Sequence, residues 1–218
     1  MASPFILASN STRRRALLAE AGYEFEVIAP AVSEVAVPHL SLCELTTANA
    51  TRKALAVSRI HLNRIVLAAD TLVALQGEVI GKPRDLNHAR VILRRLSGRT
   101  HRVCTGVCIV GLQKKISFAE ISEVRFYQLN ESAIANYFRV VNPIDKAGAY
   151  AAQGTGQSII ESVEGSFTNV IGLPMERTTE VLAQFGLQPA KASRPRLPGS
   201  WPPPARARVS IPGTKTKR

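Results

Sequence analysis

The feature that most constrains how this chain can fold is an uninterrupted apolar segment, Ile65-Val-Leu-Ala-Ala69, that ends directly in Asp70. An apolar run of this length predicts a strand buried on both faces, and such strands lie at the centre of helix-covered sheets. The carboxyl end of a central strand is where α/β folds commonly place ligands and catalytic groups. We therefore expect Asp70 to end a buried strand beside a functional site, unless it only caps a turn or pairs with Lys53 or Lys82.

Strand and helix patterns alternate along the rest of the chain. Apolar or alternating segments predict strands at 5–8, 24–28, 64–69, 79–80, 101–112 and 116–127, and capping residues with helical periodicity predict helices at 13–21, 42–59, 86–95, 131–141 and 174–186. The helix starts include a capping box from Ser41 to Glu44 and the N-cap residues Asp85 and Asn130. This order favours an α/β fold of two lobes about a mixed sheet over a simple parallel doubly wound sheet.

Residues 188–218 differ in composition from the rest of the chain. They hold eight Lys/Arg, no Asp/Glu, seven of the 13 prolines and the single tryptophan, which excludes regular helix or strand. We expect one folded domain over 1–187 and a disordered basic, proline-rich tail over 188–218. The tail either contacts polyanions weakly, the interpretation we favour, or is a polyproline or RNA-docking arm.

The charge of the folded part is close to balanced. The chain has a net charge of +12, but residues 1–187 carry 20 Lys/Arg against 16 Asp/Glu. We therefore expect no specific nucleic-acid binding by the folded domain.

Cysteine usage and hydropathy bear on where the protein functions. Cys43, Cys104 and Cys108 have no spacing typical of a disulfide framework or a zinc site, so reduced, buried thiols are expected. No apolar stretch reaches the roughly 18 residues of a membrane-spanning helix, and the first residues lack the basic and apolar regions of a signal peptide. These features predict a cytoplasmic protein without a membrane partner.

Two cationic residues fall on helix faces that are otherwise apolar. On a helical wheel, Arg14 lies at the centre of the apolar arc of helix 13–21, and Lys53 lies near the centre of the apolar face of helix 42–59. A buried guanidinium near a helix N-terminus requires an anion, either a bound phosphate or a carboxylate such as that of Glu34. Lys53 either extends its stem to solvent or borders a cleft in which an ammonium is needed.

Three further polar residues have both a structural and a functional interpretation. Lys82 lies in an extended Gly-Lys-Pro segment and is either a solvated loop lysine or a cleft residue. Glu120 lies among apolar residues of the strand 116–127 and is either a second acid in the cleft or an edge charge. Gln153 follows small residues in the Gly-rich segment 145–156, where its amide can read a base edge or the glycines simply turn the chain.

Six short motifs, in this order, resemble those of the Maf-like nucleotide pyrophosphatases over about residues 5–187. The motifs are Leu7-Ala-Ser-Asn-Ser-Thr-Arg-Arg, Ala69-Asp-Thr, Gly81-Lys-Pro, Leu96-Ser-Gly-Arg-Thr-His, Asp145-Lys-Ala-Gly-Ala-Tyr and Asn169-Val-Ile-Gly-Leu-Pro. The resemblance implies a Maf/ITPase-like α/β fold, in which two lobes surround a mixed, elongated, twisted sheet with a cleft between them. It also implies hydrolysis of nucleoside triphosphates to a monophosphate and pyrophosphate, in a house-cleaning role.

The resemblance also implies roles for particular residues. Asp70 would be the general base, and Glu34 with Asp70 would bind the divalent cation, Mg²⁺ or Mn²⁺. The triphosphate would be held by Ser9, Arg13, Arg14, Lys53 and Lys82.

Substrate choice is implied by a smaller set of positions. Arg13, Thr71 and Gln153 resemble the branch of the family that prefers dTTP and UTP, with modified pyrimidine triphosphates as further substrates. The alternatives are a preference for 7-methyl-GTP or another nucleotide, and a nucleotide-binding regulator of cell division without turnover. The sequence leaves the oligomeric state open, with a homodimer as one alternative. Thr12, Ser33 and Arg52 replace a proline, an acid and a glutamate of the family pattern.

Overall fold

The computed structural model describes residues 4–35, 37, 39–111 and 113–190. From residue 191 on, the segment expected to be a disordered tail therefore lies outside the described residues. The strands are β1 (Phe5–Leu7), β2 (Phe25–Val27), β3 (Val66–Leu75), β4 (Glu78–Ile80), β5 (Thr100–Val110), β6 (Lys115–Phe126) and β7 (Ile160–Glu164). The helices are α1 (Thr12–Glu20), α2 (Leu42–Ser58), α3 (Leu86–Leu96), α4 (Glu131–Val140), α5 (Phe167–Ile171) and α6 (Met175–Gln184), with 3₁₀ turns η1 (Ala147–Ala149) and η2 (Gly154–Ile159).

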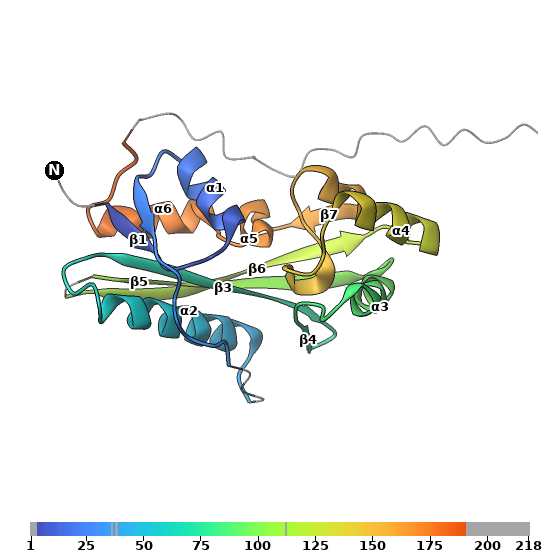
Figure 1. Cartoon of the computed structure of the whole chain (residues 1–218), viewed down its shortest axis with the longest axis horizontal. Coiled ribbons are helices and arrows are strands. Elements are labelled where there is room, and N and C mark those ends of the chain that lie inside the picture. The colour runs from blue at the N-terminus through green and yellow to red at the C-terminus, as the bar shows by residue number, and fades with distance from the viewer. Residues whose placement is uncertain (1–3, 36, 38, 112, 191–218) are drawn as a thin grey trace, which may run out of the picture.

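The described strands form one mixed sheet in the order β2-β1-β3-β5-β6-β7, with β4 paired to β3. β1 is parallel to β2 and β3, whereas the long strands β3, β5 and β6 are antiparallel to one another. These long strands run through the whole molecule (Figure 1). The expectation of an α/β fold about a mixed sheet, rather than a parallel doubly wound one, is confirmed.

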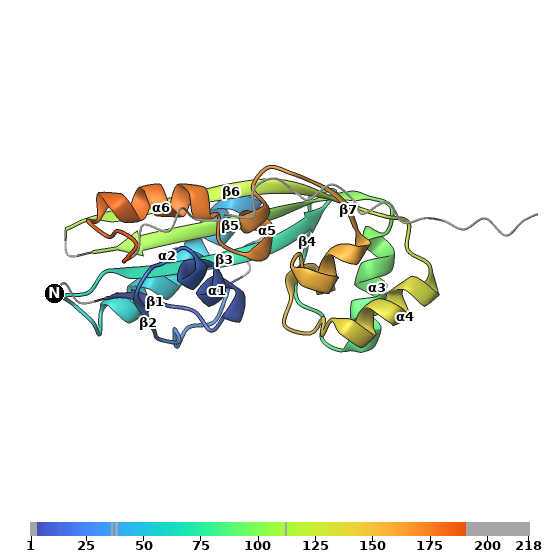
Figure 2. The same ribbon diagram turned by 90° about the horizontal axis from the view of Figure 1, so that it is seen from above.

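Two groups of elements lie at opposite ends of the long strands. The first lobe contains β1, β2, α1, α2 and α6, and the second contains β4, α3, α4, η1 and η2 (Figure 2). In the first lobe, α2 covers one face of the sheet and α1 and α6 cover the other (Figure 1). The expected two lobes are therefore present.

Local sequence signals place most helix starts correctly. Ser41 caps α2 and forms the expected capping box with Glu44, while Asp85 and Asn130 cap α3 and α4 through their side chains. None of the helices among the described residues is long and apolar enough to cross a membrane. Two elements were not expected from the sequence, β7 and α5, because both are five residues long and depend on packing against β6 and β5.

The prediction that Asp70 ends its strand is wrong. β3 continues to Leu75, so Asp70 lies in the middle of the strand, opposite Gly106 of β5. The apolar run identified in the sequence is only the first half of β3, and further apolar residues continue the strand after Thr71. Asp70 and Thr71 do not end the strand, because residues of β3 before and after them pair with β5.

Candidate functional site

The candidate site lies where one edge of β3 has no neighbouring strand. On that edge, β1 pairs with Val66 and Leu67, and β4 pairs with Val73 to Leu75. Within the described part of the chain, no strand pairs with this edge between those two registers. The gap contains Asp70 and Thr71, which project from opposite faces of the strand. Because no described strand covers this edge, both side chains reach one cavity, which has a volume of about 410 Å³.

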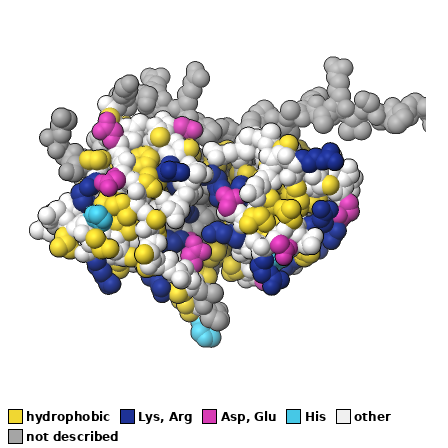
Figure 3. Space-filling view, viewed as in Figure 1, with side chains coloured by type: hydrophobic (Ala, Val, Ile, Leu, Met, Phe, Trp, Pro, Cys, Tyr) yellow, Lys and Arg dark blue, Asp and Glu magenta, His cyan; other side chains and the backbone are white. Residues whose placement is uncertain are grey.

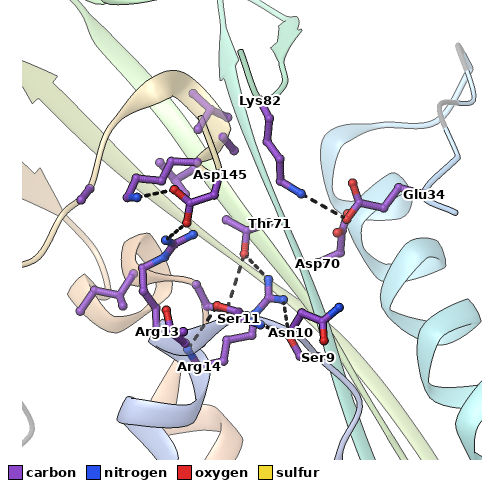
Figure 4. A pocket seen from close by; sticks show the side chains of 18 of the residues that line it. Ser9, Asn10, Ser11, Arg13, Arg14, Glu34, Asp70, Thr71, Lys82 and Asp145 are labelled. Carbon is purple, nitrogen blue, oxygen red and sulfur yellow. Dashed lines mark hydrogen bonds and ion pairs between the residues drawn. The ribbon is translucent and has the colours of Figure 1, made fainter. Parts of the chain in front are cut away.

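The cavity lies between the two lobes and is strongly polar. Figure 3 shows charged side chains around the hollow between the two halves of the molecule. Figure 4 shows the labelled side chains converging on the cavity from α1 and the loop before it, from the loop before α2, from β3, from the segment after β4 and from the loop before η1. The sequence-predicted residues that line it are Ser9, Arg13, Arg14, Glu34, Lys53, Asp70, Thr71 and Lys82.

Asp70 is held by two residues of α2. Lys53 Nζ donates to Asp70 Oδ1 at 2.6 Å, and Asn49 Nδ2 donates to Asp70 Oδ2 at 3.2 Å. The Asp70 side chain is 4% exposed and that of Lys53 is 11% exposed, so this ion pair is nearly withdrawn from water. The alternative that Asp70 pairs with Lys53 is therefore confirmed, while Lys53 at the same time lines the cavity.

Glu34 is the second acid bound to Lys53. Lys53 Nζ lies 2.7 Å from Glu34 Oε1, and Lys82 Nζ lies 3.9 Å from the same oxygen. Burial alone would raise the pKa of Glu34, but the hydrogen bond and charge of Lys53, together with the charge of Lys82, lower it to about 2. Glu34 is therefore ionised at neutral pH, and two carboxylates meet at one ammonium.

Arg14 is buried against neutral acceptors. It donates to the carbonyl oxygen of Gly172 (2.8 Å), to Thr71 Oγ1 (2.9 Å) and to Ser9 Oγ (3.2 Å). The sequence-based alternative of an ion pair with Glu34 is wrong, because Glu34 instead contacts Lys53 and Lys82. Burial lowers the pKa of Arg14 to about 10, so the guanidinium stays charged at neutral pH.

The contacts of Arg14 favour an anion in the cavity. The described residues give Arg14 no direct carboxylate partner, although it borders the cavity and lies in the first turn of α1. A buried charge that is compensated only by dipoles is stabilised by an incoming anion.

Arg13 reaches across the cavity to the second lobe. Its Nη1 lies 3.1 Å from Asp145 Oδ2, and Asp145 also pairs with Lys146 (Figure 4). Burial would raise the pKa of Asp145, but hydrogen bonds and charge from Lys146 and Arg13 hold it below its usual value. The cavity thus brings together five cations, namely Arg13, Arg14, Lys53, Lys82 and Lys146, with three carboxylates, those of Glu34, Asp70 and Asp145.

Two residues singled out in the sequence lie elsewhere. Gln153 is half-buried at the start of η2 and is not among the residues that line the cavity, although Ala151 and Ala152 are. Glu120 lies outside the cavity on β6, where its carboxylate is 3.8 Å from the Arg177 guanidinium. Of the two interpretations drawn from the sequence, the structure supports an edge charge and not a second acid in the cleft.

Several residues of the site were not assigned from the sequence. Asn49 lies one turn before Lys53 on the same face of α2, so helical spacing could have identified it. Asp145 and Lys146 belong to a quoted motif but carried no assigned role. The Gly172 carbonyl has no sequence signal, because any residue type carries the same acceptor.

Comparison with known proteins finds a family match and several similar relatives. A family model described as Maf-like protein matches residues 4–185. A dTTP/UTP pyrophosphatase of Symbiobacterium thermophilum is 46% identical over 181 residues, which is 83% of this chain and 93% of the relative. The protein of the same name from Akkermansia muciniphila is 45% identical over 186 residues (85% and 98%), and that from Bacillus cytotoxicus is 41% identical over 181 residues (83% and 95%).

Among solved structures, the Staphylococcus aureus Ham1 protein aligns with 84% of this chain and 97% of its own, at 16% identity and a TM-score of 0.48. The family match spans every element described above, from β1 to α6, and includes every residue that lines the cavity. The chain therefore belongs to the Maf-like protein family.

Proposed function

We propose that this protein hydrolyses a pyrimidine nucleoside triphosphate, dTTP or UTP, to the monophosphate and pyrophosphate. The observation that carries the proposal is Asp70, a buried acid held in place by α2 at the edge of a cavity rich in cations. The names of the relatives at 41–46% identity support the same reaction and the same pair of substrates.

The cavity suits the charge of the substrate. A nucleoside triphosphate carries about four negative charges, and cleavage next to the α-phosphorus adds charge to the departing pyrophosphate. In this proposal Arg13, Arg14, Lys53 and Lys82 hold the phosphates, and Ser9 and the N-terminal turn of α1 donate further hydrogen bonds. Thr71 would contact the nucleotide from the centre of β3, and Gln153 stays a prediction for base recognition.

In this proposal Asp70 is the general base. Each of its oxygens has one donor in the structure, from Lys53 or Asn49, which leaves lone pairs free to accept a proton from water. Water activated in this way attacks the α-phosphorus, the bond to the bridging oxygen breaks, and pyrophosphate leaves among the cations. The hydrogen bonds from Lys53 and Asn49 hold the carboxylate of Asp70 in place for this step.

Glu34 and Asp70 are the residues that would hold a divalent cation. The described residues contain no group of three or more metal-binding side chains, but two carboxylates that share one ammonium offer the oxygen donors that Mg²⁺ or Mn²⁺ prefers. Magnesium sites in phosphate-processing enzymes commonly use one or two carboxylates, with water and substrate phosphates as the other ligands. When bound, such a cation would neutralise phosphate charge.

The test is the Asp70→Asn variant, which keeps the shape of the side chain and removes its basicity. We expect turnover to fall at least about 100-fold while nucleotide binding is retained, because the cations remain and Lys53 keeps Glu34 as a partner. Glu120→Gln, which changes an acid outside the cavity, is the matched control. Near wild-type release of pyrophosphate from Asp70→Asn would refute the assignment.

A substrate panel tests the choice of nucleotide. Pyrophosphate release is measured with dTTP, UTP, CTP, ATP and 7-methyl-GTP, each with Mg²⁺ and with Mn²⁺. We expect dTTP and UTP to be the best substrates. Preference for 7-methyl-GTP would reassign the substrate, and tight binding without turnover of any nucleotide would favour a regulator.

A further inference from the structure

Two cysteines that are distant in the sequence lie in contact in the structure. Cys43, in the first turn of α2, and Cys104, on β5, have their Sγ atoms 3.5 Å apart, and both are free thiols. Neither residue lines the cavity, so the proposed hydrolysis does not use them. The pair therefore needs a separate explanation.

The contact is a consequence of how closely α2 packs on β5. A Cβ atom on Gly106 would lie 2.4 Å from backbone atoms of Thr46 and Thr47, so the helix lies directly on the strand at this point. Cys104 is two residues before Gly106 on the same strand face, and Cys43 is one helical turn before Thr46 and Thr47. Two residues of a strand span a distance similar to that of one helical turn. Cys104 and Cys43 are therefore displaced by similar distances from the point where the helix touches the strand, and their thiols meet.

The two thiols differ in accessibility. Cys43 is half-buried, whereas Cys104 is completely buried, and burial raises the pKa of the Cys104 thiol to about 12. Cys43 is thus the thiol that a small oxidant can reach first. The third cysteine, Cys108, lies further along the same face of β5, where its Sγ is 3.8 Å from Ser117 Oγ and has no thiol partner.

We propose that Cys43 and Cys104 form an oxidant-responsive dithiol site, which reacts with a peroxide and closes to an intramolecular disulfide. Cys43 Sγ attacks one peroxide oxygen and the O–O bond breaks, which gives a sulfenic acid on Cys43 and one water. Cys104 Sγ then attacks Cys43 Sγ, and the sulfenic oxygen leaves with the Cys104 proton as a second water. Two thiols and one hydrogen peroxide thus become one disulfide and two waters.

The geometry permits the second step with little movement. A disulfide requires an S–S distance of about 2 Å, and rotation of the two side chains can supply a change of roughly 1.5 Å. The bond would tie the first turn of α2 to the central sheet and would close a loop that includes Lys53 and Asp70. A cross-link across a loop of this length restricts the unfolded chain, so the oxidised protein is expected to unfold at a higher temperature.

The experiment uses the full-length chain with hydrogen peroxide as the oxidant. After treatment and quenching, the intact mass, the number of alkylatable thiols in denaturant and the peptide map are measured, with and without a reductant. We expect a loss of two hydrogens, a Cys43–Cys104 cross-linked peptide, reversal by the reductant and a thermal midpoint raised by several degrees. These readouts are independent of pyrophosphatase activity, so failure of the proposed function leaves the result interpretable.

Single variants decide between this site and unspecific oxidation. Cys108→Ser is the matched control and should form the disulfide to the same extent as the wild type. Cys43→Ser should keep a free Cys104 thiol and show no peroxide-dependent rise in the midpoint. Three alkylatable thiols after treatment, cross-linked dimers, or a Cys43 that is oxidised without loss of the Cys104 thiol would overturn the proposal.

Discussion

At the scale of single residues, the site is organised by Lys53, whose ammonium binds two acids at once. Lys53 occupies a position on α2 that helical spacing assigns to the core, and Glu34 and Asp70 approach it from the loop before α2 and from β3. Removing the partner of a buried charge leaves that charge uncompensated, which costs more than the pair itself contributes. The three residues therefore have to be understood as one unit.

The pKa of Glu34 makes the stability of the protein depend on pH at low pH. Because its folded pKa is about 2 and its ordinary value is 4.5, the unfolded chain binds more protons between these values. The stabilisation from ionised Glu34 is complete above about pH 5 and is lost as the pH falls towards 2. We expect Glu34→Gln to have a flatter dependence of unfolding free energy on pH in this window than the wild type, as measured by urea denaturation.

An exposed glutamate on α1 provides the control for that measurement. Glu20→Gln removes the same type of charge from an exposed side chain of α1, on the opposite face of the sheet from α2, and its slope between pH 5 and 2 is the reference for Glu34→Gln. A Glu34→Gln protein with the wild-type slope would show that this carboxylate is not held by Lys53.

At the scale of elements, the close packing of α2 on β5 positions the residues that hold Asp70. Gly106 is the residue that permits this contact, since a side chain there would meet the backbone of α2. Asn49 and Lys53 follow on the same helix, so the distance of α2 from the sheet sets their distance from Asp70. A glycine on β5 thus supports the site from outside the cavity.

Gly106→Ala tests this support. The added methyl group forces α2 away from β5, so we expect a loss of unfolding free energy of about 1–3 kcal/mol together with lower turnover. Gly81→Ala is the control for stability, because a Cβ there meets nothing within 4 Å. Equal unfolding free energies for the two variants would exclude a tight helix-to-strand contact at Gly106.

At the scale of the whole molecule, two ion pairs join the lobes across the cavity with opposite polarity. Arg13 of the first lobe pairs with Asp145 of the second, and Lys82 of the second pairs with Glu34 of the first. Asp145 is 59% exposed at its side chain, so its pair with Arg13 is weak and a phosphate can replace the carboxylate. In each pair, a carboxylate binds a cation that would bind a substrate phosphate in the proposed reaction.

Asp145→Asn is expected to strengthen the binding of pyrophosphate, because it removes an anion that competes for Arg13. An exposed pair is worth about 0.2–1 kcal/mol, which corresponds to a dissociation constant up to about fivefold lower by calorimetry. Glu161→Gln, which breaks a surface pair with Arg125 outside the cavity, should leave binding unchanged. Weaker pyrophosphate binding by Asp145→Asn would instead make Asp145 a residue that positions Arg13.

The expected division of the chain into a domain and a tail leads to a prediction about truncation. The last described contact of the chain is the hydrogen bond from the Ala190 N–H to the Gly22 carbonyl, and the family match ends at residue 185. We expect removal of residues 191–218 to leave the thermal midpoint within about 2 °C and turnover within about twofold of the full chain. A large loss of either would show that the domain extends into the last residues.

The sequence by itself determined the features that depend on neighbouring residues. Helix caps such as Ser41, Asp85 and Asn130, most strands, and the inward direction of Arg14 and Lys53 follow from spacing along one element, so they could be predicted. The family motifs then indicated most of the residues that line the cavity.

Only the tertiary structure decided which distant groups meet. In the structure, Asp70 lies in a gap between β1 and β4 and not at the end of a strand. Arg14 donates to the Gly172 carbonyl and not to a carboxylate, and Gln153 lies outside the lining of the cavity. The tertiary structure also joined Cys43 and Cys104, whose spacing in the sequence carries no signal. The physical reason is that strand pairing and helix packing bring together groups from separate elements, and no periodicity within one element encodes that register.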